Sequence, residues 1–386
     1  MASFTFNTTP SLVFEAGAAR RLGAIAGKRL GRSVLFVTDP GLKTLGLCDP
    51  AVVSLQSEGI SVAMFDAVEA DPSQATLMKA VEAGRTAGAT GVVGFGGGSS
   101  LDVAKLAALL VGSGEALDAA WGVGQAKGPR LPLVLVPTTA GTGSEVTPVS
   151  IITVGEEEKR GVSSPVILPD LAVLDAELTL GLPPAITAAT GVDAMVHAIE
   201  AYASKNANNN PLSRMLARQA LQLLGANIET AVSDGRNVEA RGNMLLGSML
   251  AGQAFANSPV AAVHALAYPI GGTFHIPHGL SNALVLPHVL RFNAPDAARL
   301  YAEIAPDAFP HLAREESMQS RCAAFIEELS ALSMRVGLQP RLRDVGIGED
   351  ALGKMAADAM KQQRLLVNNP REVGEADALA IYRAAW

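Results

Sequence analysis

Residues 91–110 read "GVVGFGGGSSLDVAKLAALL" and decide the fold of the chain. The stretch opens on an apolar run, passes through Gly96, Gly97 and Gly98, and ends in an apolar pattern at helical spacing. A strand, a glycine-rich turn and a helix in this order are typical of nucleotide-binding folds, because the N–H groups at a helix N-terminus bind phosphate. The match to G-x-G-x-x-G is imperfect, since Ser99 stands near the place of the last glycine, so a plain tight turn is the alternative.

Similar apolar runs on both sides of this stretch indicate a parallel sheet. They are apolar on both faces, as strands are when helices cover the whole sheet. Ala/Leu-rich helical patterns around 74–88 and 101–111 alternate with them, which is typical of a doubly wound α/β domain. Residues 150–175 predict a hairpin followed by one more strand. The predicted strands are 33–39, 61–66, 91–98 and 131–139.

The pattern changes near residue 180. From there to the end of the chain, Ala, Leu, Met and Arg recur at helical spacing and few β-branched runs remain. We therefore expect two domains, a dinucleotide-binding α/β domain over residues 1–180 and an all-α domain over residues 181–386. An Asn-rich loop over 204–214 is expected to end at the start of a helix.

The composition excludes several classes of protein. The 386 residues are 49% hydrophobic and 17% charged, so the chain can bury large cores and is not disordered. The net charge of -7 argues against nucleic acid as a partner, and no apolar run is long enough to span a membrane. The first residues lack a secretory signal pattern, so we expect a cytoplasmic protein. Cys48 and Cys322 are expected to be buried thiols, not a disulfide or a metal site.

A second loop, "VPTTAGTGSEVT" at residues 136–147, also follows a predicted strand. It is rich in small and hydroxyl-bearing residues, and the carboxyl ends of parallel strands are where open α/β sheets bind ligands. We expect its hydroxyls to line a cofactor groove, with capping of a turn as the alternative. The candidates are Thr138, Thr139, Thr142, Ser144 and Thr147.

Asp39 ends the first of the predicted strands, in "LFVTDPGL". A carboxylate there can accept hydrogen bonds from both hydroxyls of an adenosine ribose, and it would repel a 2′-phosphate, which selects NAD over NADP. Capping of a helix or turn explains the same residue equally well.

Four residues form the candidate metal site. In "GVDAMVHAIEAY", Asp193 and His197 lie four residues apart in a helical pattern and so share one face. The stretch "HALAYPIGGTFHIPHGL" at 264–280 adds His264 and His278, which glycines and a proline place on separate elements. One carboxylate and three imidazoles suit Fe(II) or Zn(II). Either half alone is weak evidence, because paired or packed helical residues are common.

At this point four blocks of the sequence, in the same order, resemble those of the iron-containing (group III, metal-dependent) alcohol dehydrogenases. They are "GFGGGSSLDVAK", "PTTAGTGSEVT", "AATGVDAMVHAIEAY" and "PHGLSNALVLPHVLRFN". The resemblance runs from about residue 5 to the end and implies a dehydroquinate synthase-like architecture, with the metal in a cleft between the two domains. It implies the metal ligands Asp193, His197, His264 and His278. It implies cofactor contacts at Asp39, Gly97, Gly98, Ser99, Thr138, Thr139, Thr142, Thr147 and Lys159.

The sequence departs from the usual pattern of the family it resembles at three positions. Tyr268 stands where many members carry a second histidine, His275 stands where many carry an asparagine, and Asp71 replaces an asparagine near the cofactor. We expect Tyr268 and His275 to share proton relay or substrate contact. The alternatives are a packed tyrosine with its hydroxyl bonded to backbone and a loop histidine bonded to solvent.

The resemblance implies NAD-dependent interconversion of an alcohol and an aldehyde or ketone, and a homodimer or larger oligomer. Four protein ligands leave an open position only at five- or six-coordination, which favours Fe(II) over Zn(II). Reduction of an oxoacid or semialdehyde, or transhydrogenation between hydroxyacid and oxoacid, is the main alternative. It is disfavoured because residues 250–280 offer no cation for an acid substrate. Two further alternatives are a sugar-phosphate lyase or synthase and an inactive nucleotide-binding relative.

Overall fold

The computed structural model describes residues 3–155 and 158–386, which form two compact units. The α/β unit comprises residues 7–139 and 143–180. The helical unit comprises residues 181–386, together with 140–142 and the segment before residue 7. The threonine-rich loop is therefore divided, since its middle belongs to the helical unit.

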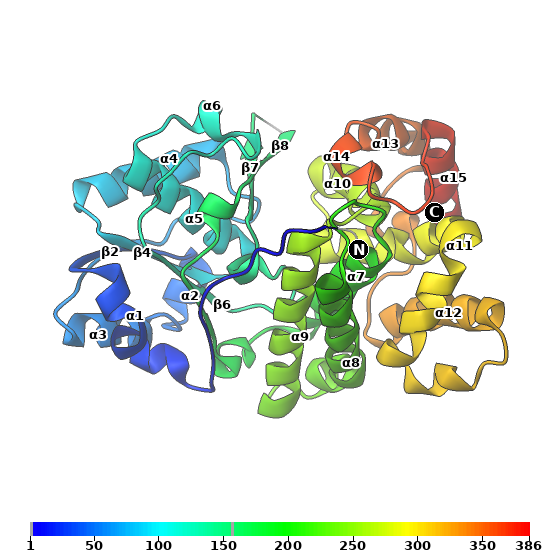
Figure 1. Ribbon diagram of the computed structural model, residues 1–386, viewed down its shortest axis with the longest axis horizontal. Helices are drawn as coiled ribbons and strands as arrows, with labels where there is room; N and C mark the ends of the chain where they lie inside the picture. The colour runs from blue at the N-terminus through cyan, green and yellow to red at the C-terminus, as the bar shows by residue number, and fades with distance from the viewer. Residues whose placement is uncertain (1–2, 156–157) are drawn as a thin grey trace. The chain divides into compact units, whose positions relative to one another are not determined.

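A six-stranded parallel sheet is the centre of the α/β unit (Figure 1). Its order is β1-β9-β6-β4-β2-β3, and every neighbouring pair is parallel. The predicted parallel sheet is confirmed. Its strands are β1 (Leu12–Phe14), β2 (Ser33–Val37), β3 (Ser61–Phe65), β4 (Gly91–Gly96), β6 (Leu133–Pro137) and β9 (Leu171–Leu174).

Helices cover both faces of this sheet, as the apolar strands require. In β2, Val34 and Phe36 belong to the core under α1 and α3, whereas Leu35 and Val37 belong to the core under α4 and α5. All four side chains are fully buried. The helices of the unit are α1 (Leu22–Leu30), α2 (Pro40–Thr44), α3 (Asp49–Ser57), α4 (Gln74–Thr86), α5 (Gly98–Ser113) and α6 (Leu117–Ala120).

A smaller sheet, β5-β8-β7, completes this unit. Strands β7 (Val149–Val154) and β8 (Glu158–Ser163) are antiparallel, and β9 follows them in the chain. The predicted hairpin and following strand are therefore present. Strand β5 (Gly122–Val123) pairs with β8.

The helical unit contains no strand among its described residues, as the sequence predicts. Helix α8 packs against α7 and α9, and α11 packs against α7 and α12. No described helix is long and apolar enough to cross a membrane. The helices are α7 (Pro184–Ala203), α8 (Pro211–Ser233), α9 (Val238–Asn257), α10 (Ala262–Phe274), α11 (His278–Ala308), α12 (Met318–Arg335), α13 (Leu352–Ala359), α14 (Gln363–Leu366) and α15 (Glu375–Ala385).

The expected interruption between His264 and His278 lies later than the sequence suggests. Gly271 and Gly272 are inside α10, and the chain turns only after Phe274. His275 ends the helix in the left-handed conformation, with φ of 55°. The two histidines still come from separate helices, α10 and α11.

Candidate metal and cofactor sites

Helix α7 aligns three functional side chains on one face. Asp193, His197 and Glu200 follow one another at spacings of four and three residues, so they lie on successive turns. The helix is buried over most of its length, and these side chains are buried with it. A buried carboxylate or imidazole needs a partner, because its lost hydration must be replaced.

Two histidines from other helices meet Asp193. Nε2 of His264 lies 3.9 Å from Oδ1 of Asp193, and Nε2 of His278, the first residue of α11, lies 3.8 Å from the same oxygen. The donor atoms of the three residues all lie within 4.8 Å of one another. Two ligands of one transition-metal ion, each about 2.1 Å from it, are at most about 4.2 Å apart. The spacing from Asp193 to either histidine therefore suits a shared cation.

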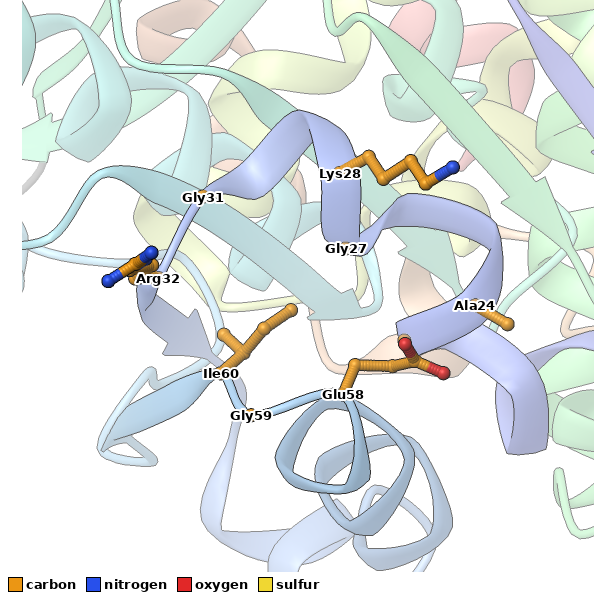
Figure 2. A pocket seen from close by; sticks show the side chains of 9 residues that line it. Ala24, Gly27, Lys28, Gly31, Arg32, Glu58, Gly59 and Ile60 are labelled. Carbon is orange, nitrogen blue, oxygen red and sulfur yellow. The ribbon is translucent and has the colours of Figure 1, made fainter.

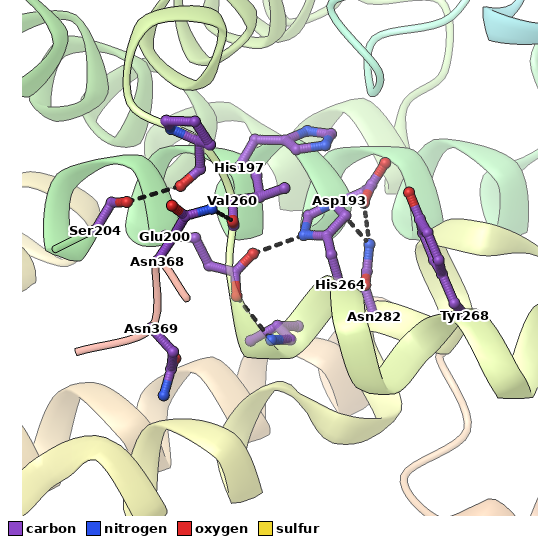
Figure 3. A network of polar contacts seen from close by, with 12 residues as sticks. Asp193, His197, Glu200, Ser204, Val260, His264, Tyr268, Asn282, Asn368 and Asn369 are labelled. Carbon is purple, nitrogen blue, oxygen red and sulfur yellow. Dashed lines mark hydrogen bonds and ion pairs between the residues drawn. The ribbon is translucent and has the colours of Figure 1, made fainter. Parts of the chain in front are cut away.

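Glu200 orients the His264 ring and selects the tautomer of its neutral form. Nδ1 of His264 lies 2.7 Å from Oε2 of Glu200, whose Oε1 accepts a hydrogen bond from the backbone N–H of Val263 at 2.7 Å (Figure 3). A carboxylate accepts, so Nδ1 carries the proton and Nε2 presents a lone pair. His264 Nε2 and the Asp193 carboxylate are thus both acceptors that face each other.

Asn282 supplies the donor among these acceptors. Its Nδ2 donates to Oδ1 of Asp193 at 2.6 Å and lies 3.3 Å from Nε2 of both His264 and His278. Its own Oδ1 is buried and accepts no hydrogen bond from the described residues. An N–H donor at the meeting point of a carboxylate and two imidazole nitrogens shows that the site attracts positive charge, so the donor set fits a divalent metal.

His197 lies beside this group of three and is not part of it. Its ring stacks on His264, with centroids 4.7 Å apart, and on Phe255 at 4.4 Å. Nδ1 donates to the carbonyl of Gly141 at 3.2 Å, which leaves Nε2 for a ligand. Burial lowers the pKa of His197 to about 3, so its imidazole is neutral, as metal binding requires.

Tyr268 and His275 have different surroundings. Tyr268 lies one turn after His264 on α10, and its ring centroid is 6.3 Å from that of His278. Its hydroxyl accepts a hydrogen bond from the guanidinium of Arg364 at 3.1 Å. His275 is exposed, and its side chain makes no hydrogen bond to another described residue, although its backbone N–H bonds to Gly271.

The glycine loop has the form expected of a phosphate site. Gly97 is the N-cap of α5 with no side-chain capping bond, Gly98 is the first helical residue, and Ser99 follows in the same turn. A Cβ at Gly97 would be in van der Waals contact with the side chain of Thr139, at 3.6 Å, so the two loops lie next to each other here. Gly96 has φ of 151° and a Cβ there would meet Ser100 Oγ at 2.7 Å, so this turn requires glycine.

Several polar groups of the threonine loop form hydrogen bonds within the protein. The backbone N–H of Thr138 bonds to the carbonyl of Gly96 at 2.9 Å, which joins the two loops. Thr139 and Thr142 are partly exposed. Thr147 is buried, and its hydroxyl accepts a hydrogen bond at 3.2 Å from Lys105, a fully buried side chain. Thr147 therefore has an internal partner that the sequence did not indicate.

Asp39 and Lys159 also have partners. Asp39 caps α2, accepting the N–H of Leu42 at 3.0 Å, as the alternative interpretation predicts. Lys159 on β8 pairs with Asp71 at 2.6 Å. Asp71 has φ of 53°, a conformation uncommon outside glycine and found at strained functional positions.

A surface hollow of about 350 Å³ lies elsewhere in the α/β unit. Figure 2 shows Glu58 and Ile60 on one side of it and the helix that carries Gly27 on the other. A Cβ at Gly23 would lie 2.1 Å from the carbonyl oxygen of Ser54, so glycine there allows α1 and α3 to pack closely. The hollow lies where α1 packs against the end of α3, and none of the predicted cofactor residues lines it.

Two residues of the metal site were missed by the sequence analysis. Glu200 lies three residues after His197, and Asn282 lies four after His278, so both could have been found by extending the helical spacing. The parallel α/β unit with its glycine loop and the buried cluster of candidate ligands are together typical of metal-dependent enzymes that use a nucleotide cofactor.

Comparisons with known proteins give the family. The iron-containing alcohol dehydrogenase model matches residues 9–176, and the model for the C-terminal part of the Fe-containing alcohol dehydrogenase family matches residues 187–386. The chain belongs to the iron-containing alcohol dehydrogenase family.

Individual relatives agree over nearly the whole chain. Long-chain-alcohol dehydrogenase 1 of Geobacillus thermodenitrificans is 43% identical, over 93% of this chain and 91% of the relative. A crystal structure of 1,3-propanediol oxidoreductase is 35% identical with a TM-score of 0.95, covering 100% of both chains. Sulfoacetaldehyde reductase from Bifidobacterium kashiwanohense, in complex with NAD+, is 28% identical with a TM-score of 0.87, covering 99% and 98%. The protein is an NAD-dependent enzyme that interconverts alcohols and aldehydes.

Proposed function

We propose that the enzyme holds one divalent metal, Fe(II) in preference to Zn(II), on Asp193, His197, His264 and His278. The observation that carries the proposal is the meeting of the Asp193 carboxylate with Nε2 of His264 and Nε2 of His278 around one donor, Asn282 Nδ2. The free Nε2 of His197, in the ring stacked on His264, is the fourth candidate. Iron fits best because its coordination shell keeps a position open for substrate.

When bound, the metal polarises the substrate oxygen and NAD exchanges a hydride with the adjoining carbon. The side chains around them prepare the site. Glu200 holds the His264 ring with Nε2 toward the ligand group, and Asn282 holds the Asp193 carboxylate. We assign proton transfer at the substrate oxygen to the hydroxyl of Tyr268, with the exposed His275 as an alternative carrier to solvent.

We propose that the first domain, residues 1–180, binds NAD and that the second, residues 181–386, holds the metal. Gly97, Gly98 and Ser99 at the N-terminus of α5 would bind the pyrophosphate. The absence of a side-chain cap at this helix N-terminus supports the proposal. Asp39 would accept the ribose hydroxyls. The other proposed cofactor contacts are Thr138, Thr139, Thr142, Thr147 and Lys159.

The decisive test is turnover by reconstituted protein. Metal-free enzyme is loaded anaerobically with Fe(II) and, separately, with Zn(II), and NADH formation is followed against a panel of alcohols. We expect activity with at least one alcohol, higher with Fe(II). Absence of turnover with both metals, in protein whose metal content is verified, would favour the inactive nucleotide-binding relative instead. Reduction of an oxoacid coupled to oxidation of a hydroxyacid, with no NAD added, would favour transhydrogenation.

Two broader proposals follow from the family. The enzyme is proposed to be cytoplasmic and to form a homodimer or larger homo-oligomer. Light scattering on the purified protein measures the oligomeric state, and a monomer would contradict the second of these. Fractionation of cells that express the tagged chain tests the first.

A further inference from the structure

A cation from a distant part of the chain contacts Tyr268, which lies one turn after His264. Arg364 belongs to the short helix α14, yet its guanidinium donates to the hydroxyl of Tyr268 at 3.1 Å, and its Cζ lies 5.8 Å from the centroid of the tyrosine ring. The sequence between 250 and 280 contains no lysine or arginine, so this charge is invisible in the local sequence. The fold supplies the cation that an acid substrate requires.

The charge of Arg364 is not neutralised by any carboxylate among the residues that the structure describes. Nearby cations differ, because Lys354 and Lys361 both pair with Asp358. Arg364 is exposed and uses one N–H on Tyr268, while a guanidinium carries five N–H donors in a planar fork. That fork matches the oxygens of a carboxylate or another oxyanion.

Tyr268 places the charge next to the metal ligands. It lies one turn after His264 on α10, and its ring is 6.3 Å from His278. Figure 3 shows its hydroxyl end on the side of Asp193 and Asn282. The hydrogen bond and the ring contact together hold a long, mobile side chain near the site, which lowers the entropy lost when Arg364 binds a ligand.

We propose that Arg364 is a specificity-determining residue that binds the anionic end of a short aldehyde or alcohol carrying a carboxylate or sulfonate. The inference rests on the proposed function, in which the other end of the substrate reacts beside Asp193, His264 and His278. In the reducing direction, NADH transfers a hydride to the carbonyl carbon and becomes NAD+. The carbonyl π electrons move to oxygen, which takes one proton from the Tyr268 hydroxyl, and solvent returns a proton to Tyr268. The anionic group is unchanged.

The test compares charged and neutral substrates with the metal-loaded enzyme. γ-Hydroxybutanoate and isethionate are the carboxylate and sulfonate arms, and n-butanol is the neutral reference. In Arg364→Gln we expect kcat/KM for the preferred anion to fall about 10- to 100-fold relative to kcat/KM for n-butanol, the effect of losing a charged hydrogen bond. Any effect of the lost contact with the Tyr268 hydroxyl is shared by both substrates and cancels in this ratio. In Arg364→Lys, kcat/KM for the preferred anion should lie between the values of the wild type and Arg364→Gln. Lys361→Gln, which removes a neighbouring paired charge, is the matched control and should behave like the wild type.

Several outcomes overturn the proposal. Equal losses for charged and neutral substrates in Arg364→Gln would do so, and so would a wild-type enzyme that oxidises n-butanol but neither anion. If no alcohol at all is oxidised, the proposed function fails, and calorimetry with butanoate and propanesulfonate on the Zn(II)-loaded protein decides the role of Arg364. Weaker binding in Arg364→Gln than in Lys361→Gln supports anion binding. Equal affinities refute it.

Discussion

Oε2 of Glu200 lies 2.7 Å from Nδ1 of His264, and both side chains are buried. A carboxylate behind an imidazole fixes the ring orientation and makes the other nitrogen a stronger ligand. The second oxygen of Glu200 is held by the backbone of Val263, so the carboxylate itself cannot rotate freely. The contact therefore holds His264 in the orientation that the proposed metal site requires.

Glu200→Gln should weaken metal binding about 10- to 100-fold, the usual cost of removing such a partner. Competition between metal-free protein and a chromophoric chelator for Zn(II) measures this directly, without reference to turnover. Glu327→Gln, an exposed glutamate that pairs with Arg291, is the control. Unchanged Zn(II) affinity in Glu200→Gln would show that Glu200 is only a packing partner.

A second prediction concerns Asn282. Its Nδ2 lies within hydrogen-bonding distance of Asp193, His264 and His278. Asn282→Asp replaces it with an acceptor beside the Asp193 carboxylate. We expect the metal-free variant to unfold at a lower temperature than the wild type, since like charges repel at short range.

Added Zn(II) should raise the unfolding temperature of Asn282→Asp more than that of the wild type, because the ion neutralises the added charge. Differential scanning fluorimetry with and without metal measures both shifts. Asn282→Ala, which loses the donor without adding charge, separates repulsion from lost hydrogen bonding. Equal metal-induced shifts in wild type and Asn282→Asp would argue against a cation at this position.

The sequence determined the fold more completely than it determined the site. The strands were predictable because short runs such as the one that contains Val34 and Leu35 are apolar on both faces and rich in β-branched residues, which is typical of a sheet covered on both sides. The shared helix face of Asp193 and His197 was predictable because the two residues lie four apart in a helical pattern. Arg364 was not, since its contact with Tyr268 spans 96 residues and depends on how α14 packs against α10.

Glu145 predicts a pH dependence of stability in the α/β unit. Burial raises its pKa from 4.5 to about 7, Lys105 lowers it in part, and Oε1 accepts no hydrogen bond from the described residues. Between these two pH values the folded chain holds a proton that the unfolded chain has lost. Stability therefore falls as pH rises through this window.

Glu145→Gln should remove that component and flatten the free energy of unfolding between pH 4.5 and about 7. The difference from the wild type above this window should be at most about 3 kcal/mol, from 1.36 kcal/mol per unit of pKa. Urea unfolding at several pH values measures it, and the facing groups Lys105 and Asp102 are left intact. If the free energy of unfolding depends on pH in the same way in the wild type and in Glu145→Gln, Glu145 is not the group that titrates.

Asp39 allows the cofactor role to be separated from the structural one. Its side chain caps α2 through the N–H of Leu42, so Asp39→Gly should cost a few tenths of a kcal/mol of stability while also removing the charge. Asp39→Asn keeps a capping oxygen and removes only the charge. If the carboxylate selects NAD by repelling a 2′-phosphate, both variants should raise the ratio of kcat/KM for NADP to that for NAD. Measurement of that ratio together with the unfolding temperature distinguishes the two roles. If the NADP-to-NAD ratio of kcat/KM in Asp39→Asn equals that of the wild type, Asp39 acts only as a helix cap.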